Sequence, residues 1–210
     1  MIKIFAFGIL FFFYSVYIGK MLMQKRKGII TDHIAKSQIH NKEFYIEIIM
    51  KIATYSIVFV EILSIIFGYS LLPIWLQIVG CVIGYIGDFI FANAVWTMRD
   101  SWRAGLARED QTKMVTRGIY KISRNPAFLG FDLMYIGICL CFFHPILFVF
   151  TIWAIVMLHL QIRQEEKYLA EVFGQEYQNY KAKTRRYLGW KLKKKKKKIG
   201  DNIYVSDRSR

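Results

Sequence analysis

The chain has 210 residues, of which 55% are hydrophobic and 17% aromatic, and it carries a formal net charge of +15. Its mean hydropathy of +0.28 exceeds that of an ordinary soluble domain, so the composition favours an integral membrane protein. The same composition argues against a nucleic-acid partner, because the apolar runs would have no soluble core to enter.

Five apolar segments are candidates for helices that cross a bilayer, which requires about 20 residues. In chain order they cover residues 2–23, 52–72, 74–98, 126–143 and 145–162. The first segment is not followed by a small-residue cleavage signal, so we expect a retained span rather than a signal peptide. We therefore predict an all-α integral membrane protein with about five transmembrane helices.

Two features of these segments predict how they pack. Gly80, Gly84 and Gly87 recur at helical spacing, and such a row of small residues lets two helices approach closely in lipid. Three acids lie inside predicted spans, where a charge is costly and indicates either pairing or function. They are Glu61, Asp88 and Asp132.

After the fifth segment, residues 163–183 predict an amphipathic helix outside the membrane, and residues 187–210 a basic, disordered tail. Nearly all Lys and Arg lie in residues 24–51, in residues 99–124 and in the C-terminal segment after the fifth span, residues 163–210. By the positive-inside rule these three segments face the cytoplasm, and the N-terminus faces the other side. The lysine run 193–198 is expected to contact anionic lipid headgroups, at about 1 kcal/mol per basic residue, or to serve only as a topology anchor.

Metal and disulfide chemistry are not expected. The cysteines lie in apolar runs without a paired motif, which is typical of packing residues. The histidines are scattered without ligand spacing, and the common nucleotide-binding, metalloprotease and hydrolase motifs do not occur. The residues are Cys81, Cys139, Cys141, His33, His40, His144 and His159.

Two polar, aromatic stretches, residues 116–130 and 161–180, flank the nearly uncharged segment 131–160. If that segment forms a helical hairpin, both stretches lie on the same side of the membrane. We therefore expect a cytoplasmic-face site at the bilayer surface.

Each stretch offers chemistry of its own. Pro126 is suited to the first turn of a helix, and a helix N-terminus presents free N–H groups that bind carboxylates and phosphates. The alternative is a plain helix start with Arg124 reaching toward water. Glu165 and Glu166 would face this helix start across the hairpin, unless they are ordinary surface charges balanced by Arg163 and Lys167.

Five motifs occur in a fixed order in the C-terminal half, over about residues 99–186. They are Asp100-Ser101-Trp102-Arg103, Gly118-Ile119-Tyr120, Arg124-Asn125-Pro126-Ala127-Phe128-Leu129-Gly130, Glu165-Glu166 and Phe173-Gly174-Gln175-Glu176-Tyr177-Gln178-Asn179-Tyr180. Together, this ordered set resembles the isoprenylcysteine carboxyl methyltransferase family, whose wider group includes phospholipid N-methyltransferases. Each motif is weak alone, and the order and spacing make the set specific.

The resemblance implies a membrane methyltransferase that uses S-adenosyl-L-methionine. It implies cofactor contacts at Thr112, Lys113, Met114, Val115, Tyr120, Asn125, Pro126, Ala127, Phe128 and Glu165. Two positions depart from the family pattern, with Asn125 in place of a histidine and Phe128 in place of a tyrosine.

The resemblance also suggests catalytic residues. Glu166 neighbours Glu165 and can exchange roles with it. The family has a substrate-binding arginine shortly before the acid pair; strict spacing gives Gln161 at that position, and Arg163 is the nearest arginine. We therefore predict Arg163 and Glu166 as catalytic residues, with no metal.

Methyl transfer from a sulfonium is an in-line displacement in which the enzyme supplies alignment and excludes water. We predict methylation of a lipophilic acceptor, nominally a C-terminal S-isoprenylcysteine carboxylate, in the cell membrane with the site facing the cytoplasm. The alternatives are a phospholipid N-methyltransferase, an NADPH-dependent membrane reductase and a non-catalytic basic membrane protein. The predicted regions are 1–98 (three spans), 99–186 (catalytic) and 187–210 (tail).

Overall fold

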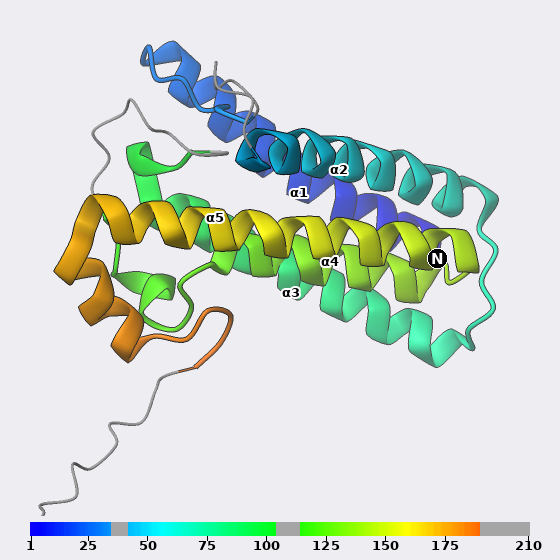
Figure 1. The fold of residues 1–210 in the computed structure, drawn as a ribbon. Coiled ribbons are helices and arrows are strands. Elements are labelled where there is room, and N and C mark those ends of the chain that lie inside the picture. Colours follow the sequence, from blue (N-terminus) through cyan, green and yellow to red (C-terminus); the bar gives the residue numbers. More distant parts are fainter. Residues whose placement is uncertain (35–41, 104–113, 190–210) are drawn as a thin grey trace, which may run out of the picture.

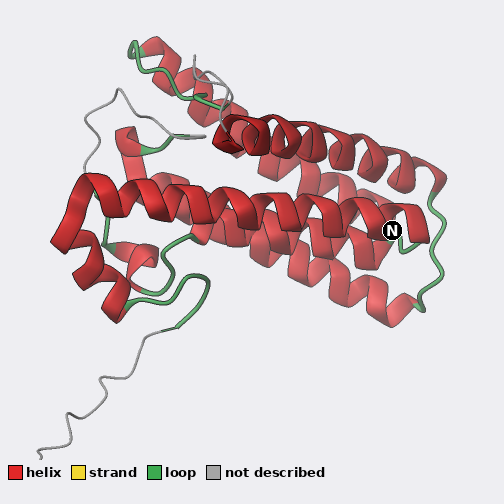
Figure 2. Ribbon diagram, in the orientation of Figure 1, coloured by secondary structure: helices red, strands yellow, loops and turns green. Residues whose placement is uncertain are grey.

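A computed structural model describes residues 1–34, 42–103 and 114–189 (Figure 1). These residues fold into helices joined by loops, and the described part of the chain contains no β-strand (Figure 2). The predicted all-α class is therefore confirmed.

Five α-helices and two short 3-10 helices follow one another along the described residues. They are α1 (Ile2–Arg26), α2 (Lys42–Phe67), α3 (Ile74–Met98), η1 (Arg99–Ser101), η2 (Gly118–Lys121), α4 (Pro126–Cys141) and α5 (Pro145–Lys183). Of these, α1, α2, α3 and α5 are long and apolar enough to cross a membrane, as expected of an integral membrane protein. Helix α4 has 16 residues and is about 24 Å long, which is shorter than the roughly 30 Å hydrocarbon layer.

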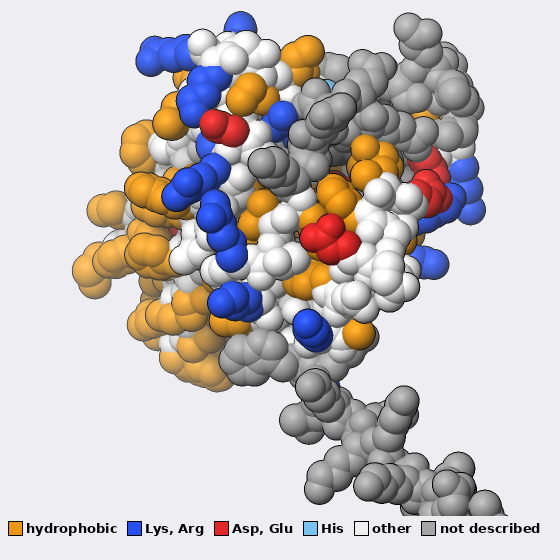
Figure 3. Space-filling model, turned by 90° about the vertical axis from the view of Figure 1, so that its left-hand side faces the viewer, with side chains coloured by type: hydrophobic (Ala, Val, Ile, Leu, Met, Phe, Trp, Pro, Cys, Tyr) orange, Lys and Arg blue, Asp and Glu red, His pale blue; other side chains and the backbone are white. Residues whose placement is uncertain are grey.

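Successive α-helices alternate in direction, so the connections collect at two ends of the bundle (Figure 1). One end, called the loop end below, carries η1, η2, the start of α4 and the last part of α5. The N-terminus and the turns before α3 and α5 lie at the other end. Figure 3 views the loop end and shows Lys and Arg side chains spread across it, so the described parts of the two basic loops lie at one end, as predicted.

Glycines set the closest helix pair, α3 with α4. A Cβ atom added to Gly137 would lie 2.5 Å from the backbone nitrogen of Gly84, and one added to Gly80 would lie 2.6 Å from the carbonyl oxygen of Gly137. Because no side chain fits between these backbones, the predicted glycine row of α3 is confirmed as a packing surface.

The aromatic core joins α1 to this pair. The ring centroids of Phe13 and Phe91 are 4.2 Å apart, and those of Phe13 and Phe131 are 4.6 Å apart. Such offset and edge-on ring contacts are favourable beyond the area they bury. Helix α5 packs chiefly on α2 instead, so α4 and α5 form a looser hairpin than expected and leave space between them.

Several predicted boundaries were wrong. Helix α2 begins at Lys42 instead of 52, because the mixed segment 42–51, with four charged residues among apolar and aromatic ones, continues the helix, and it stops before Gly68, which has a φ of +70° that favours glycine. Helix α4 ends at Cys141 rather than 143. Helix α5 continues past Ile162 to Lys183, where a separate amphipathic helix was predicted, and its backbone breaks at Gly174 (φ 46°, ψ −120°). The apolar part of α5, over which the fifth span was predicted, ends at Ile162, so Glu165 and Glu166 lie beyond it.

Candidate active site

A buried ion cluster joins the start of α4 to α5 at the loop end. Arg124 Nη2 lies 2.7 Å from Glu166 Oε1, and Arg186 Nη2 lies 2.8 Å from Glu166 Oε2. Asn125 Nδ2 also donates to Glu166 Oε1 at 3.1 Å. The Arg124 and Glu166 side chains are only 5% and 6% exposed, so the charges compensate one another in a site that excludes water.

The cluster controls the ionisation of Glu166. Burial by itself would raise the pKa of this carboxyl, but hydrogen bonds from Arg186 and Arg124 lower the pKa to about 2. Glu166 is therefore a carboxylate throughout the physiological range, and all of the described bonds of its oxygens are to the protein itself.

Residues 184–189, called the C-terminal strap below, follow α5 and fold back on the start of α4. The Arg124 backbone N–H donates to the Arg185 carbonyl at 3.0 Å, and the Gly189 N–H donates to the Ile122 carbonyl at 3.0 Å. The Asn125 side chain donates to the Arg186 carbonyl and to Glu166 rather than capping α4. The strap thus fixes the first turn of α4 in place.

Two cavities lie beside this turn. The outer cavity, about 130 Å³, is at the loop end. It is lined by Met98, Ser101, Trp102, Arg103, Met114, Val115, Tyr120, Arg124, Asn125, Ala127, Phe128, Glu165, Leu169, Phe173, Tyr177 and Tyr180.

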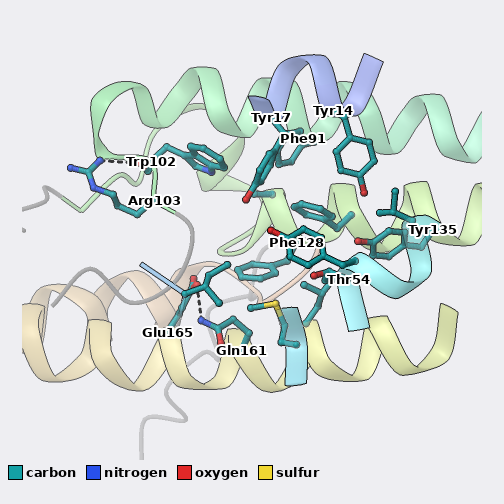
Figure 4. A pocket seen from close by; sticks show the side chains of 17 residues that line it. Tyr14, Tyr17, Thr54, Phe91, Trp102, Arg103, Phe128, Tyr135, Gln161 and Glu165 are labelled. Atoms are coloured by element: carbon teal, nitrogen blue, oxygen red, sulfur yellow. Dashed lines mark hydrogen bonds between the residues drawn. The ribbon is translucent and has the colours of Figure 1, made fainter. Parts of the chain in front are cut away.

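The inner cavity, about 140 Å³, lies deeper, among all five α-helices (Figure 4). It is mainly apolar and aromatic. It is lined by Tyr14, Tyr17, Ile34, Met50, Thr54, Tyr55, Val58, Phe91, Trp102, Arg103, Ala127, Phe128, Phe131, Tyr135, Leu158, Gln161 and Glu165.

The two cavities share a wall, called the junction below, which consists of Trp102, Arg103, Ala127, Phe128 and Glu165. A molecule bound in either cavity can therefore contact these residues. Pockets with mainly apolar walls and a few convergent polar groups are typical binding sites.

The position of Trp102 depends on a residue far away in the chain. Gln24, at the end of α1, is fully buried; its Nε2 donates to the Trp102 carbonyl at 3.0 Å, and its Oε1 accepts from Thr31 Oγ1 at 2.7 Å. The Arg103 guanidinium is bonded to the backbone carbonyls of Asp100 and Trp102. Helix α1 therefore helps to hold one side of the junction.

Glu165 differs sharply from its neighbour Glu166. Burial raises the pKa of Glu165 to about 8, against a smaller lowering by its hydrogen bond with Gln161, whose Nε2 donates to Oε1 at 3.4 Å. Among the described residues Glu165 has no ion-pair partner. A half-buried acid of this kind in a cavity wall is suited to a cationic ligand, because an incoming ammonium would stabilise its charged form.

The structure brings most of the predicted cofactor residues together. Seven of them line the outer cavity: Met114, Val115, Tyr120, Asn125, Ala127, Phe128 and Glu165. Pro126 is buried at the first position of α4. Thr112 and Lys113 lie outside the described residues.

The two predicted catalytic residues lie elsewhere. Arg163 is exposed on α5 and lines neither cavity, whereas Gln161 is 1% exposed and lines the inner one. Glu166 is held in the ion cluster. Their catalytic roles stay predictions.

Several site residues were missed by the sequence analysis. Trp102, Arg103, Phe173, Tyr177 and Tyr180 belong to the quoted motifs, which was the available signal. Nothing in the sequence marked Arg186, Gln24 or the inner-cavity tyrosines, whose roles depend on contacts between distant segments.

The acids inside the predicted spans do not join the ion cluster. Arg124 is bound to Glu166, because that carboxylate lies directly across from the start of α4. In the described structure both carboxyl oxygens of Glu61 and of Asp88, and Oδ1 of Asp132, have no hydrogen-bond partner.

Comparison with known proteins supports the resemblance. Residues 75–176 match the family described as phospholipid methyltransferase. The chain is 34% identical over 124 residues to the protein-S-isoprenylcysteine O-methyltransferase of Saccharomyces cerevisiae, covering 57% of this chain and 51% of that protein. It is 32% identical over 111 residues to a probable protein-S-isoprenylcysteine O-methyltransferase of Oryza sativa subsp. indica, covering 50% and 57%.

A third relative, protein-S-isoprenylcysteine O-methyltransferase B of Arabidopsis thaliana, is 29% identical over 111 residues, covering 50% of this chain and 55% of that protein. The chain thus spans about half the length of the curated relatives it matches. The family match ends within α5 and includes the start of α4, the junction residues and Glu165–Glu166.

Proposed function

We propose that this protein is an S-adenosyl-L-methionine-dependent methyltransferase acting on a lipophilic membrane acceptor, nominally the carboxylate of a C-terminal S-isoprenylcysteine. The observation that carries the proposal is the junction, where a loop-end cavity and a mainly apolar cavity share Glu165 and Phe128. A water-soluble donor and a lipid-borne acceptor can meet only at such a place. The names of the matched relatives support the same reaction.

The outer cavity fits the donor. Glu165 has no ion-pair partner among the described residues and offers a half-buried carboxyl to the amino group of the methionine part, while the rings of Tyr120, Phe128 and Phe173 offer faces for a heterocycle. The first turn of α4 adds N–H groups that the Asn125 side chain does not cap. When bound, S-adenosyl-L-methionine supplies a methyl group on a positively charged sulfur.

The inner cavity fits the hydrocarbon part of the acceptor. Its walls come from all five α-helices, and Phe91, Phe131 and Leu158 give them an apolar surface. A hydrocarbon tail bound there contacts apolar walls instead of the surrounding lipid, and its reacting end is directed toward the junction. Water is kept from the junction by Trp102 and Phe128.

The ion cluster has a positioning role in this proposal. Glu166 and the C-terminal strap hold Arg124 and Asn125, and these hold the first turn of α4 against the outer cavity. Arg163 stays a predicted catalytic residue for a carboxylate acceptor. We also propose that the loop end faces the cytoplasm, since it carries the basic residues, and that the lysine run contacts anionic lipid headgroups.

The test is calorimetric binding of S-adenosyl-L-methionine to the full chain in detergent, with Glu165→Gln and the control Glu171→Gln. Glu171 is on the same helix, and its side chain is 64% exposed. Wild type and control should bind alike, and Glu165→Gln should bind at least about tenfold more weakly, as expected for the loss of a charged hydrogen bond.

No binding by folded wild type would contradict the proposal. NADPH titrated in parallel would then test the reductase alternative, and addition of a lipid amine or an S-farnesylcysteine derivative to a binding-competent protein would separate N-methylation from O-methylation.

A further inference from the structure

Two cysteines from different helices meet where α3 packs on α4. The sulfur atoms of Cys81 and Cys141 lie 3.4 Å apart, although 60 positions separate the two residues in the chain. Both are buried and both are free thiols. A buried cysteine commonly serves as a small apolar residue, but that role does not require a second thiol at hydrogen-bond distance. The pair is therefore a candidate for a covalent link between the two helices.

The helix backbones come close enough for such a link. Cys81 follows Gly80 in the glycine row of α3, and a Cβ atom added to Gly80 would lie 2.9 Å from the backbone nitrogen of Cys141. Disulfides join residues whose Cα atoms are about 4.4–6.8 Å apart. Because the two backbones are already in contact here, rotation of the two side chains is expected to bring the sulfur atoms into bonding distance.

The third cysteine provides an internal comparison. Cys139 is on α4, two positions before Cys141, and it is also buried. Residues two positions apart on an α-helix project about 200° apart around its axis, so Cys139 points away from the side of α4 that carries Cys141. In the described structure the thiol–thiol hydrogen bond joins Cys81 to Cys141, and Cys139 has none. Only one pair of thiols is thus placed for bonding.

The pair lies toward the end of the bundle opposite the loop end. Cys141 is the last residue of α4, and Cys81 follows the first residue of α3, Ile74, by seven positions, or about 10 Å along the helix. In the proposed orientation this end is directed away from the cytoplasm, whose reducing systems keep thiols from pairing. That support rests on the proposed orientation, whereas the contact of the two sulfur atoms does not.

We propose that Cys81 and Cys141 form a disulfide site that a peroxide closes, linking α3 covalently to α4. One thiol attacks the O–O bond of hydrogen peroxide, which gives a sulfenic acid and one water molecule. The second thiol attacks the sulfenic sulfur, so that the S–S bond forms and the hydroxyl leaves as a second water molecule. The two sulfur atoms together lose two electrons, which the peroxide gains, and both thiol protons end in water. Burial slows the first step, because the thiolate is the nucleophile, so closure is expected over hours.

The test counts thiols in the full chain in detergent, before and after overnight exposure to hydrogen peroxide. The peroxide is then removed with catalase, and the thiols are titrated after denaturation. The chain has three cysteines, so wild type should fall from three thiols to one, and dithiothreitol should restore all three. Mass spectrometry of the unreduced protein should find the peptide of Cys81 linked to the peptide of Cys141.

The variants are Cys81→Ser and the matched control Cys139→Ser, which both replace sulfur by oxygen in a buried side chain. Each starts with two thiols. Cys139→Ser should lose both, whereas Cys81→Ser should keep both. The unfolding midpoint without peroxide checks that each variant is folded, and Cys141→Ser takes the place of Cys81→Ser if that variant does not fold.

Peroxide should also raise the unfolding midpoint of wild type, by about 5–10 °C, because a disulfide that closes a long loop restricts the unfolded chain. The midpoint of Cys81→Ser should not rise. Retention of all three thiols by wild type, a loss that dithiothreitol does not reverse, or an equal loss in Cys81→Ser and Cys139→Ser would each overturn the proposal. No S-adenosyl-L-methionine is present, so the result is independent of the methyltransferase proposal.

Discussion

The Arg124 guanidinium and the Glu166 carboxylate lie 2.7 Å apart, although 42 residues separate them in the chain. The pair connects the first turn of α4 to α5 just beyond the membrane-spanning part of that helix. Arg186, in the C-terminal strap, donates a hydrogen bond to the other oxygen of the same carboxylate. The first turn of α4 lines both cavities. The stability of this cluster and the geometry of the site therefore depend on the same few bonds.

Replacing Glu166 by Gln should therefore destabilise the protein. Two arginines would lose their only described carboxylate partner, and breaking a buried ion pair typically costs about 3–5 kcal/mol. Thermal unfolding in detergent should show a clearly lower midpoint for Glu166→Gln than for the exposed control Glu171→Gln. Equal midpoints would mean that the cluster contributes little to the folded state.

The same carboxylate predicts an acid limit. Its pKa in the folded protein is about 2 and its ordinary value is 4.5. A lowered pKa stabilises the fold fully above about pH 4.5, and this contribution is lost as the pH falls toward 2. The difference in unfolding midpoint between wild type and Glu166→Gln should shrink over that window. A difference that stays constant from pH 6 to pH 3 would contradict the assigned ionisation.

Much of this arrangement was predictable from the sequence. The lengths of the apolar segments predicted where the helices lie. The roles of the α3 glycines and of the α4 proline could be read from their positions along a helix. Helix ends were less predictable, because segments that contain charged residues, 42–51 of α2 and 163–183 of α5, continue helices that hydropathy treats as finished. Those segments are stabilised by contacts such as that of Lys167 with Glu43, 3.4 Å apart, which no local pattern reveals.

The candidate site likewise has features that the sequence predicted and features that it did not. Seven cofactor residues predicted from the resemblance line one cavity, because the motifs are contiguous and fold locally. The different roles of Glu165 and Glu166 were not predictable, since they depend on which helix face meets Arg186. The division of the chain at residues 98 and 186 also stays a prediction.

Cofactor binding should release a proton. With a pKa of about 8, raised by burial, Glu165 is mostly protonated at pH 7. Pairing with the ammonium group of S-adenosyl-L-methionine would favour the carboxylate, so binding should release up to about one proton at pH 7 and fewer as the pH rises past 8. Calorimetry in two buffers of different ionisation enthalpy measures this number. A release that persists in Glu165→Gln would assign the proton to another group.

The close contact of α3 and α4 predicts a strong effect of a single methyl group. Gly137→Ala would place a carbon 2.5 Å from the Gly84 nitrogen, so the helices must separate, at a cost of about 1–3 kcal/mol. The matched control is Gly19→Ala on α1, where nothing lies within 4 Å and alanine favours the helix. Unfolding midpoints should therefore change in opposite directions, and equal changes would show that the helix contact tolerates expansion.

Gln161 and Arg163 are the two candidates for the residue that recognises the acceptor. Strict motif spacing and burial favour Gln161, which is 1% exposed, lines the inner cavity and donates to Glu165 at the junction. Charge favours Arg163, the residue predicted from the sequence, but it is exposed and away from both cavities. A surface cation attracts a carboxylate only weakly through water, so the geometry predicts the larger effect at Gln161.

We expect Gln161→Ala to raise the acceptor KM about tenfold, equivalent to one lost hydrogen bond, and Arg163→Ala to change it less than twofold. Steady-state methylation of an S-farnesylcysteine derivative measures both, with the unfolding midpoint in detergent as the check that each variant is folded. The reverse order would restore Arg163 as the acceptor residue and would require α5 to turn about its axis when the acceptor binds.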